Sequence, residues 1–329
     1  MTHLAPSLRR ALGAFAVAAA TLLAAACGGG EATTTFRASR VVVFGDESSL
    51  LVDPGDHNAR KYSVNGIVSD TDPTIACTVN PLWVQAVATF YGLVFPECNA
   101  GATPVVAPVS RIRATVGARA ADLAAQIDAQ QAESPLQAGD MTTVLIGAND
   151  VIAQYAQYPT LSEAELIANV EAAGAETGRQ VNRIVDTGAK VLLATILDIG
   201  VTPFGVAERA AHTDTDRAAL LTRMSQRYNA GMRGTIVNDG RRIGLILLDE
   251  FVSAVAKFPG LDGYTNTTNG VCDLTKSTLT PPSILDCTSK TFVAGGSGAY
   301  LWADDRHLSG TGQSSLGSLA LARAQNNPF

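Results

Sequence analysis

The chain has 329 residues, of which 47% are hydrophobic and 16% are charged, and its formal net charge is −6. This apolar content suffices for a large folded core and excludes a disordered chain, while the acidic balance without a Lys/Arg cluster argues against a nucleic-acid partner. Beyond the N-terminal segment, no apolar run reaches the roughly 18 residues of a membrane-spanning helix, which excludes a polytopic membrane protein.

The N-terminal segment has the pattern of an export signal. Arg9 and Arg10 precede an apolar stretch that ends in small residues just before Cys27. A positive start followed by a short apolar segment and small residues is typical of a signal peptide. The residues around Cys27 resemble a bacterial lipoprotein box, in which the cysteine becomes the lipid-modified first residue. Ordinary cleavage that leaves Cys27 as a spare thiol is the alternative.

These signals divide the chain into three segments. We expect a signal peptide over 1–26, a lipid-modified Cys27 with a flexible tether over 27–38, and one folded domain over 39–329. The residue after Cys27 is Gly28, not the Asp that usually signals retention in the inner membrane. We therefore expect an exported protein whose lipid anchors it in the bacterial envelope, at the outer membrane.

Short apolar runs alternate with amphipathic segments along the rest of the chain. Strands are predicted over 40–44, 93–95, 142–146, 190–197 and 243–248. Helices are predicted over 80–90, 119–132, 162–187, 216–236 and 309–324, and the third opens with a capping box of Ser162 and Glu165. Apolar strands separated by helices indicate a parallel sheet covered on both faces. The predicted fold is a three-layer α/β/α sandwich with a central, mostly parallel sheet, as in flavodoxin-like proteins.

Four cysteines follow Cys27, and an even count in an exported protein favours disulfide bonds. Proximity in the sequence favours the pairs Cys77–Cys98 and Cys272–Cys287, although three pairings are possible. A metal site is not expected, because no Cys-x-x-Cys motif occurs and the chain has only four histidines.

Polar or glycine-rich turns follow the predicted strands, where function gathers in parallel sheets. They are Gly45–Ser49, Asn99–Ala102 and Gly147–Asp150, and a fourth polar turn, Asp304–His307, precedes the last helix. Together they contain the groups needed for acyl transfer: a hydroxyl nucleophile, a base that activates it, and a carboxylate that orients the base.

Individual residues can be assigned to these tasks. His307 is the histidine expected at this edge of the sheet, and Asp304 lies one turn before it, so it can orient the imidazole. Asn149 can donate its side-chain N–H to an oxyanion, and Gly101 can donate its backbone N–H.

The order of these blocks (FGDxS, then Gly, then GxND, then DxxH) resembles the SGNH/GDSL hydrolases. Two further segments resemble larger bacterial and plant members: Tyr62–Gly66 with Asn80–Trp83, and Gly263–Asn266 with Cys272. The resemblance covers nearly the whole mature chain. It implies a three-layer fold and an esterase or lipase that uses Ser, His and Asp without metal or cofactor. It assigns Gly101 and Asn149 to the oxyanion hole, His307 as base and Asp304 as its orienter.

The chain departs from the family at the nucleophile, because Gly45-Asp46 is followed by Glu47, Ser48 and Ser49. One interpretation is a longer turn in which Ser48 or Ser49 supplies the hydroxyl. A second is that Glu47 has replaced the nucleophile and the protein is a non-catalytic, ligand-binding lipoprotein; the ungapped alignment favours this. A third is that Glu47 acts as a base for water.

From these alternatives the sequence-based expectation is hydrolysis of a carboxylic ester through Ser48, His307 and Asp304. The expected substrate is a small-molecule or lipid ester. The membrane is expected to be a partner only through the N-terminal lipid.

Overall fold

A computed structural model of the chain describes residues 36–99 and 109–326. The chain divides into two compact units, Met1–Phe36 and Arg37–Phe329, and every helix and strand given below belongs to the second. The predicted signal peptide, Cys27, most of the tether and Gly101 lie outside the described residues. Within those ranges, no helix combines the length and hydropathy needed to span a membrane.

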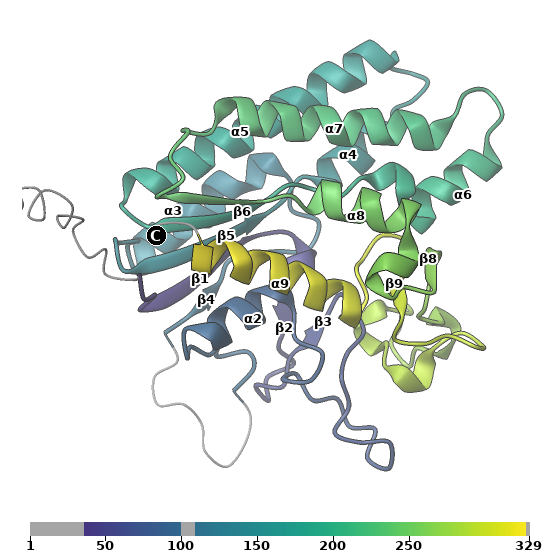
Figure 1. Ribbon diagram of the computed structural model, residues 1–329, viewed down its shortest axis with the longest axis horizontal. Coiled ribbons are helices and arrows are strands. Elements are labelled where there is room, and N and C mark those ends of the chain that lie inside the picture. Colours follow the sequence, from purple (N-terminus) through teal and green to yellow (C-terminus); the bar gives the residue numbers. More distant parts are fainter. Residues whose placement is uncertain (1–35, 100–108, 327–329) are drawn as a thin grey trace, which may run out of the picture. The chain divides into compact units, whose positions relative to one another are not determined.

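Five parallel strands form the central sheet (Figure 1), in the order β4-β1-β5-β6-β7. Their bounds are β1 Arg40–Gly45, β4 Arg111–Ile112, β5 Asp140–Leu145, β6 Lys190–Ala194 and β7 Ile243–Ile246. β1 and β5 are buried along their whole length, as expected for strands covered on both faces. Four of the predicted strands are thereby confirmed, although β6 and β7 end earlier than expected.

Helices cover both faces of this sheet, which confirms the three-layer α/β/α fold (Figure 1). On one face lie α3 Leu123–Glu133, α4 Ala148–Tyr155, α5 Glu163–Asp186 and α7 Arg217–Thr235. On the other, α2 Trp83–Phe90 packs beside α9 Gly310–Asn326. Two further helices, α6 Pro203–Ala211 and α8 Leu248–Lys257, follow β6 and β7.

Capping and burial explain why these helices form where they do. The predicted capping box is present at α5, where Ser162 Oγ accepts from the Glu165 N–H and the Glu165 carboxylate accepts from the Ser162 N–H. Apolar side chains of α3, α5 and α7 fill a core against the strands. The helical spacing of Trp83, Val87 and Phe90 predicts one shared buried face in α2; Trp83 and Val87 are buried, whereas Phe90 is 47% exposed and does not share that face.

The predicted strand over 93–95 is wrong. Gly92, with a φ of +70°, ends the α2 region in a turn, and Pro96 follows after only three residues, so no ladder forms there. The strand that pairs with the outer side of β1 is β4, which has only two residues, Arg111 and Ile112, both partly exposed. The loop that follows β4 contains Gly117.

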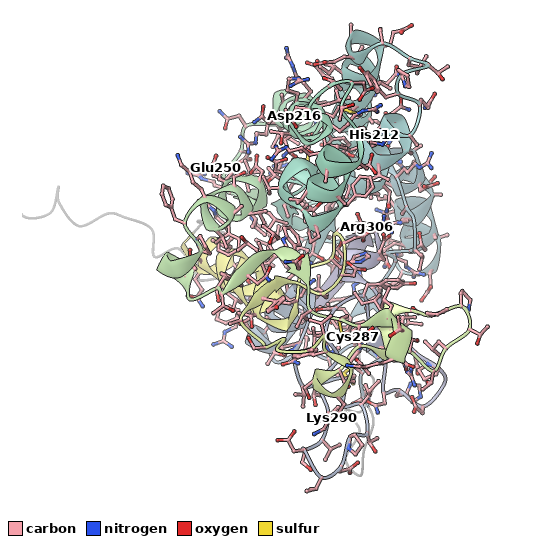
Figure 2. All side chains as sticks on the ribbon, turned by 90° about the vertical axis from the view of Figure 1, so that its right-hand side faces the viewer. His212, Asp216, Glu250, Cys287, Lys290 and Arg306 are labelled. Atoms are coloured by element: carbon pink, nitrogen blue, oxygen red, sulfur yellow. A yellow bond between two sulfur atoms is a disulfide. The ribbon has the colours of Figure 1, made fainter. Side chains whose placement is uncertain are left out.

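Two disulfide bonds tie down the loops outside the sheet, and both predicted pairings are confirmed: Cys77–Cys98 and Cys272–Cys287. The second lies in a small apolar cluster that also contains Val271 and Ile284. Figure 2 looks at the molecule from this side, with Cys287 and Arg306 labelled. A short parallel pair, β8 Asn266–Gly270 and β9 Tyr300–Trp302, leads from this region towards α9.

Lys61 is a fully buried amine in the short antiparallel pair formed by β2 Leu51–Val52 and β3 Arg60–Lys61, and burial lowers its pKa to about 7. Its ammonium donates to the backbone carbonyls of Cys77, Val79 and Asn80 at 3.0, 2.7 and 2.9 Å. A buried charge is tolerated only with such partners. The side chain thereby fixes the segment that precedes α2.

Candidate active site

The turn after β1 carries the residues that the sequence singled out first. Gly45 has a φ of +134°, and a Cβ there would lie 2.0 Å from the carbonyl oxygen of Leu145, so only glycine lets β1 and β5 end side by side. Asp46 then caps a short 3-10 helix, Glu47–Ser49, by accepting from the Ser48 N–H at 3.0 Å. This turn directs the Glu47 side chain, which is 8% exposed, towards His307.

The two serines of this turn make their hydrogen bonds elsewhere. The Ser49 hydroxyl is fully buried and accepts from the indole N–H of Trp83 at 3.0 Å. Ser48 hydrogen-bonds to Asp46 and lines a small cavity of about 20 Å³ with Leu145 and Leu316. The structure therefore does not bring the predicted hydroxyl nucleophile together with the predicted base.

His307 and Asp304 come together as predicted in the loop between β9 and α9. His307 Nδ1 lies 2.7 Å from Asp304 Oδ2, and the His307 backbone N–H donates to Asp304 Oδ1 at 2.8 Å. Both sides of the ring are enclosed, since its side chain is 7% exposed and the Tyr62 ring lies 5.6 Å away, centroid to centroid. Because Asp304 accepts at Nδ1, the opposite nitrogen, Nε2, is left to act on other groups.

The Glu47 carboxylate lies beside Nε2, the opposite ring nitrogen of His307. Its Oε1 is 3.6 Å from His307 Nε2. Its Oε2 accepts from the backbone N–H of Gly117 at 2.8 Å and from Asn149 Nδ2 at 3.0 Å. The structure thus brings Glu47, His307, Asp304 and the predicted Asn149 into one centre.

Gly117 is the donor that the sequence analysis did not find. It follows β4, has a φ of +72°, and reaches the end of β1 because Thr115 N donates to the Gly45 carbonyl at 3.1 Å. The resemblance gave this task to Gly101, which lies outside the described residues. β4 is short and partly exposed, so it lacks the apolar run that would have marked the strand and the glycine after it.

Charge is concentrated in this centre. Burial alone would raise the pKa of Glu47, but hydrogen bonds from His307 and from the backbone, with the positive charge of His307, hold it below its usual value. Burial and the neighbouring Glu47 charge raise the pKa of Asp46. Burial alone would lower the pKa of His307, but Asp304 and Glu47 raise it to about 10. The resting centre is therefore a protonated imidazole between two carboxylates at neutral pH.

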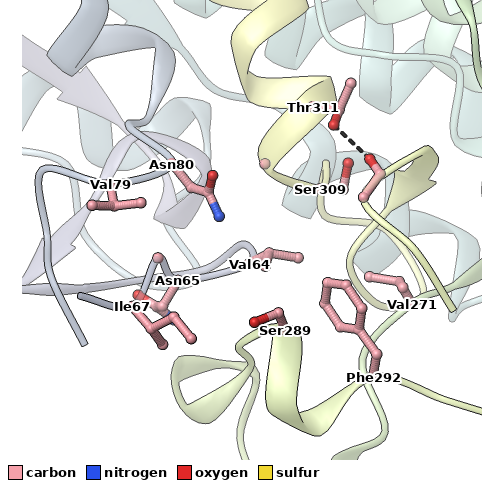
Figure 3. A pocket seen from close by; sticks show the side chains of 13 residues that line it. Val64, Asn65, Ile67, Val79, Asn80, Val271, Ser289, Phe292, Ser309 and Thr311 are labelled. Atoms are coloured by element: carbon pink, nitrogen blue, oxygen red, sulfur yellow. Dashed lines mark hydrogen bonds between the residues drawn. The ribbon is translucent and has the colours of Figure 1, made fainter. Parts of the chain in front are cut away.

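A cavity of about 250 Å³ is lined by residues that include Val64 and Ser309 (Figure 3). Asn80 and Phe292 also line it. Every described residue that lines the cavity is uncharged, so it suits a neutral group. Among the described residues, no cluster of His, Cys, Asp or Glu has an arrangement that could hold a metal ion.

Comparisons with known proteins give similarities of fold. No protein-family model matches the sequence, and no curated protein matches it. A lipase from a goat rumen metagenome is 11% identical with a TM-score of 0.49, and the match covers 88% of this chain and 99% of that one. Axe2, an acetylxylan esterase from Geobacillus stearothermophilus, is 14% identical with a TM-score of 0.42, covering 89% and 97%.

A Bacillus subtilis protein solved by a structural genomics consortium is 15% identical with a TM-score of 0.37. The match covers 88% of this chain but only 56% of the length of that protein. At these identities and scores, neither membership of a family nor an activity is drawn from the likenesses.

The fold is of the three-layer α/β/α kind that the resemblance to SGNH/GDSL hydrolases implies. This description depends on the arrangement within the chain itself. Five parallel strands end at one edge. That edge carries the turn after β1, the Asn149 turn after β5 and the Asp304–His307 loop, in the order that the sequence resemblance implies.

Proposed function

We propose that the chain is a carboxylic ester hydrolase in which His307, oriented by Asp304, activates water once the Glu47 carboxylate no longer keeps its imidazole protonated. Gly117 N and Asn149 Nδ2 are the proposed oxyanion donors. The observation that carries this proposal is the convergence of an oriented imidazole and two N–H donors on the same carboxylate. A base within reach of the attacking group and two donors around the oxygen that becomes charged are the requirements of ester hydrolysis.

Water is the proposed attacking group because the serines do not face the imidazole. The Ser49 hydroxyl is engaged by Trp83 in the core, and Ser48 is directed at Asp46. A displaced hydroxyl is a poor nucleophile, since a misplacement of about 1 Å can already cost two orders of magnitude in rate. The proposed substrate is a small-molecule or lipid ester that carries a neutral group, which the uncharged cavity favours.

Non-catalytic ligand binding is the second candidate, and one observation favours it. The Glu47 carboxylate itself occupies both oxyanion donors. An external ester would have to displace this charged group before its own carbonyl oxygen could be held. If Glu47 never leaves, the site binds without turnover.

We also propose that the protein is exported and held at the outer membrane by a lipid on Cys27. The two disulfide bonds support export, because such bonds persist in oxidising compartments outside the cytoplasm. Mass spectrometry of the protein from membranes of its host would test the lipid on Cys27. An unmodified Cys27 thiol would contradict it.

The test of the activity is hydrolysis of p-nitrophenyl esters of increasing acyl length by the wild type and two variants. His307→Ala should lower kcat/KM by at least ~100-fold, as expected for loss of a general base. Ser48→Ala should retain activity within about twofold, because no hydrogen bond in the described structure joins Ser48 to His307. Loss of all activity in Ser48→Ala would assign the nucleophile to Ser48. A wild type that binds esters without hydrolysing any of them would favour the binding protein.

A further inference from the structure

The two oxygens of Glu47 have different surroundings. Oε2 is held by both oxyanion donors, Gly117 N at 2.8 Å and Asn149 Nδ2 at 3.0 Å. Oε1 is 3.6 Å from His307 Nε2 and belongs to an ionised carboxylate. Oε2 thus lies where the carbonyl oxygen of an ester on Glu47 would be held, and Oε1 is the oxygen that can form a bond to a substrate.

We propose, as an extension that rests on the proposed function, that Glu47 is a covalent nucleophile towards saturated carbon. The substrate class is a neutral alkyl compound with an anionic leaving group, such as an alkyl halide or alkyl sulfonate. Glu47 Oε1 forms a bond to the alkyl carbon, and the bond from that carbon to the leaving group breaks with its electron pair. The product of this step is an alkyl ester of Glu47 and a free anion. The ester that the site then hydrolyses is the alkyl ester formed on Glu47.

The second step uses the groups already in place. His307 Nε2 takes a proton from water, and the hydroxide forms a bond to the carboxyl carbon of the Glu47 ester. The negative charge develops on Oε2, where Gly117 N and Asn149 Nδ2 hold it. The bond to the alkoxide then breaks, and the alkoxide takes the proton back from His307. The net reaction converts an alkyl compound and water into an alcohol, the leaving anion and one proton.

The charges in the centre set the order of the two steps. In the resting site, the carboxylates of Glu47 and Asp304 keep His307 protonated. Alkylation removes the charge of Glu47, so His307 loses one of the two groups that raise its pKa, and its proton passes to solvent. The imidazole becomes a base only once there is an ester to hydrolyse.

Saturated carbon fits this site better than other electrophiles do. An acyl carbonyl would need the donors that Glu47 Oε2 already occupies, whereas an alkyl carbon needs none. A phosphoryl or other anionic substrate would approach the carboxyl groups of Asp46, Glu47 and Asp304 against repulsion.

The test uses 4-nitrobenzyl chloride as the probe, with intact-mass measurement and peptide mapping. In His307→Gln, the 4-nitrobenzyl ester should accumulate on Glu47 to one per chain, and release of 4-nitrobenzyl alcohol should fall at least ~100-fold. Glu47→Gln should acquire no label. Glu250→Gln is the matched control, since Glu250 is an exposed carboxylate distant in sequence (Figure 2), and it should behave like the wild type.

A single turnover of the wild type in H₂¹⁸O needs no variant to fold. The proposal requires ¹⁸O in the Glu47 carboxylate and none in the first equivalent of alcohol. If ¹⁸O enters the alcohol directly, or if no chain carries a label on Glu47, the covalent role is overturned.

The two proposals can fail separately. Hydrolysis of p-nitrophenyl esters that depends on His307, without any label on Glu47, overturns the covalent role alone. A Glu47 ester that persists in the wild type as long as in His307→Gln overturns both the covalent turnover and the hydrolytic role of His307.

Discussion

Removing the charge of Glu47 while keeping its shape should lower the pKa of His307 strongly. In Glu47→Gln, the amide oxygen can still accept from Gly117 N and Asn149 Nδ2, so the fold of the centre is retained. The imidazolium, however, loses one of its two anionic partners. The variant therefore isolates the contribution of one charge.

The magnitude follows from the separation of the two groups. At 3.6 Å, and with an effective dielectric constant of about 20, two unit charges attract each other by about 4 to 5 kcal/mol. One pKa unit corresponds to about 1.4 kcal/mol, so this attraction could account for a pKa lowered by about 3. Partial replacement by the amide dipole and by water reduces the effect, and we expect the pKa of His307 to fall from about 10 to roughly 7 or 8.

The raised pKa of His307 should also make the free energy of unfolding depend on pH. The folded-state pKa of His307 lies above the unfolded value of 6.5, so its contribution to the free energy of unfolding is complete below pH 6.5 and is lost as the pH rises to about 10. The free energy of unfolding of the wild type should therefore fall across this window. In Glu47→Gln the fall should be smaller and should end at a lower pH.

The assay is a titration of the imidazole resonances by NMR in wild type and variant. His57 and His212 serve as internal references, because their side chains are 60% and 43% exposed and neither contacts Glu47 in the described structure. A His307 pKa that is the same in both proteins would refute the ion pair between Glu47 and His307. So would a shift of equal size in all three histidines.

Glu47→Ser places a hydroxyl between the imidazole and the two donors, and it should raise hydrolysis of p-nitrophenyl acetate at least ~100-fold over the wild type; equal initial rates would contradict this. Lys61→Met leaves three buried carbonyls without their donor and should lower the free energy of unfolding by about 2 to 4 kcal/mol in urea. The exposed Lys257→Met is its control, and a similar loss in both would show that the buried contacts contribute little. Replacing Cys77 and Cys98 together by Ala opens a loop with a sequence separation of 21 and should lower the free energy of unfolding by about 3 kcal/mol. The variant should have a lower Tm than the oxidised wild type; an unchanged Tm would argue against a stabilising role of this disulfide.

Much of the sheet could be predicted because its strands are buried on both faces. β1 and β5 read as short apolar runs in the sequence, and their burial explains why. β4 could not be predicted in this way, since an edge strand of two partly exposed residues needs no apolar side chains. The run at 93–95 is apolar for a different reason: it packs beside α2 and carries no ladder.

Some residues of the candidate site could likewise be predicted from the sequence, and others could not. Asp304 and His307 are three residues apart, so local geometry was enough to predict their pairing. Asn149 was predictable because it follows a buried strand directly. Gly117 depended on β4, and its role could only be recognised from the contact with Glu47. The function of Glu47 depends on side-chain directions, which the order of residues does not determine.

The surroundings of Glu47 distinguish two kinds of activity. Donors that hold a charge equally well before and during a reaction give binding but no acceleration. In the resting site, Gly117 N and Asn149 Nδ2 already hold the charged Oε2, so they add nothing for an external ester until Glu47 leaves. In an alkyl ester of Glu47 the same oxygen is neutral at first and becomes charged only as water attacks. The donors then favour the transition state over the ground state, so the geometry that hinders external esters is the one that would accelerate hydrolysis of an ester on Glu47.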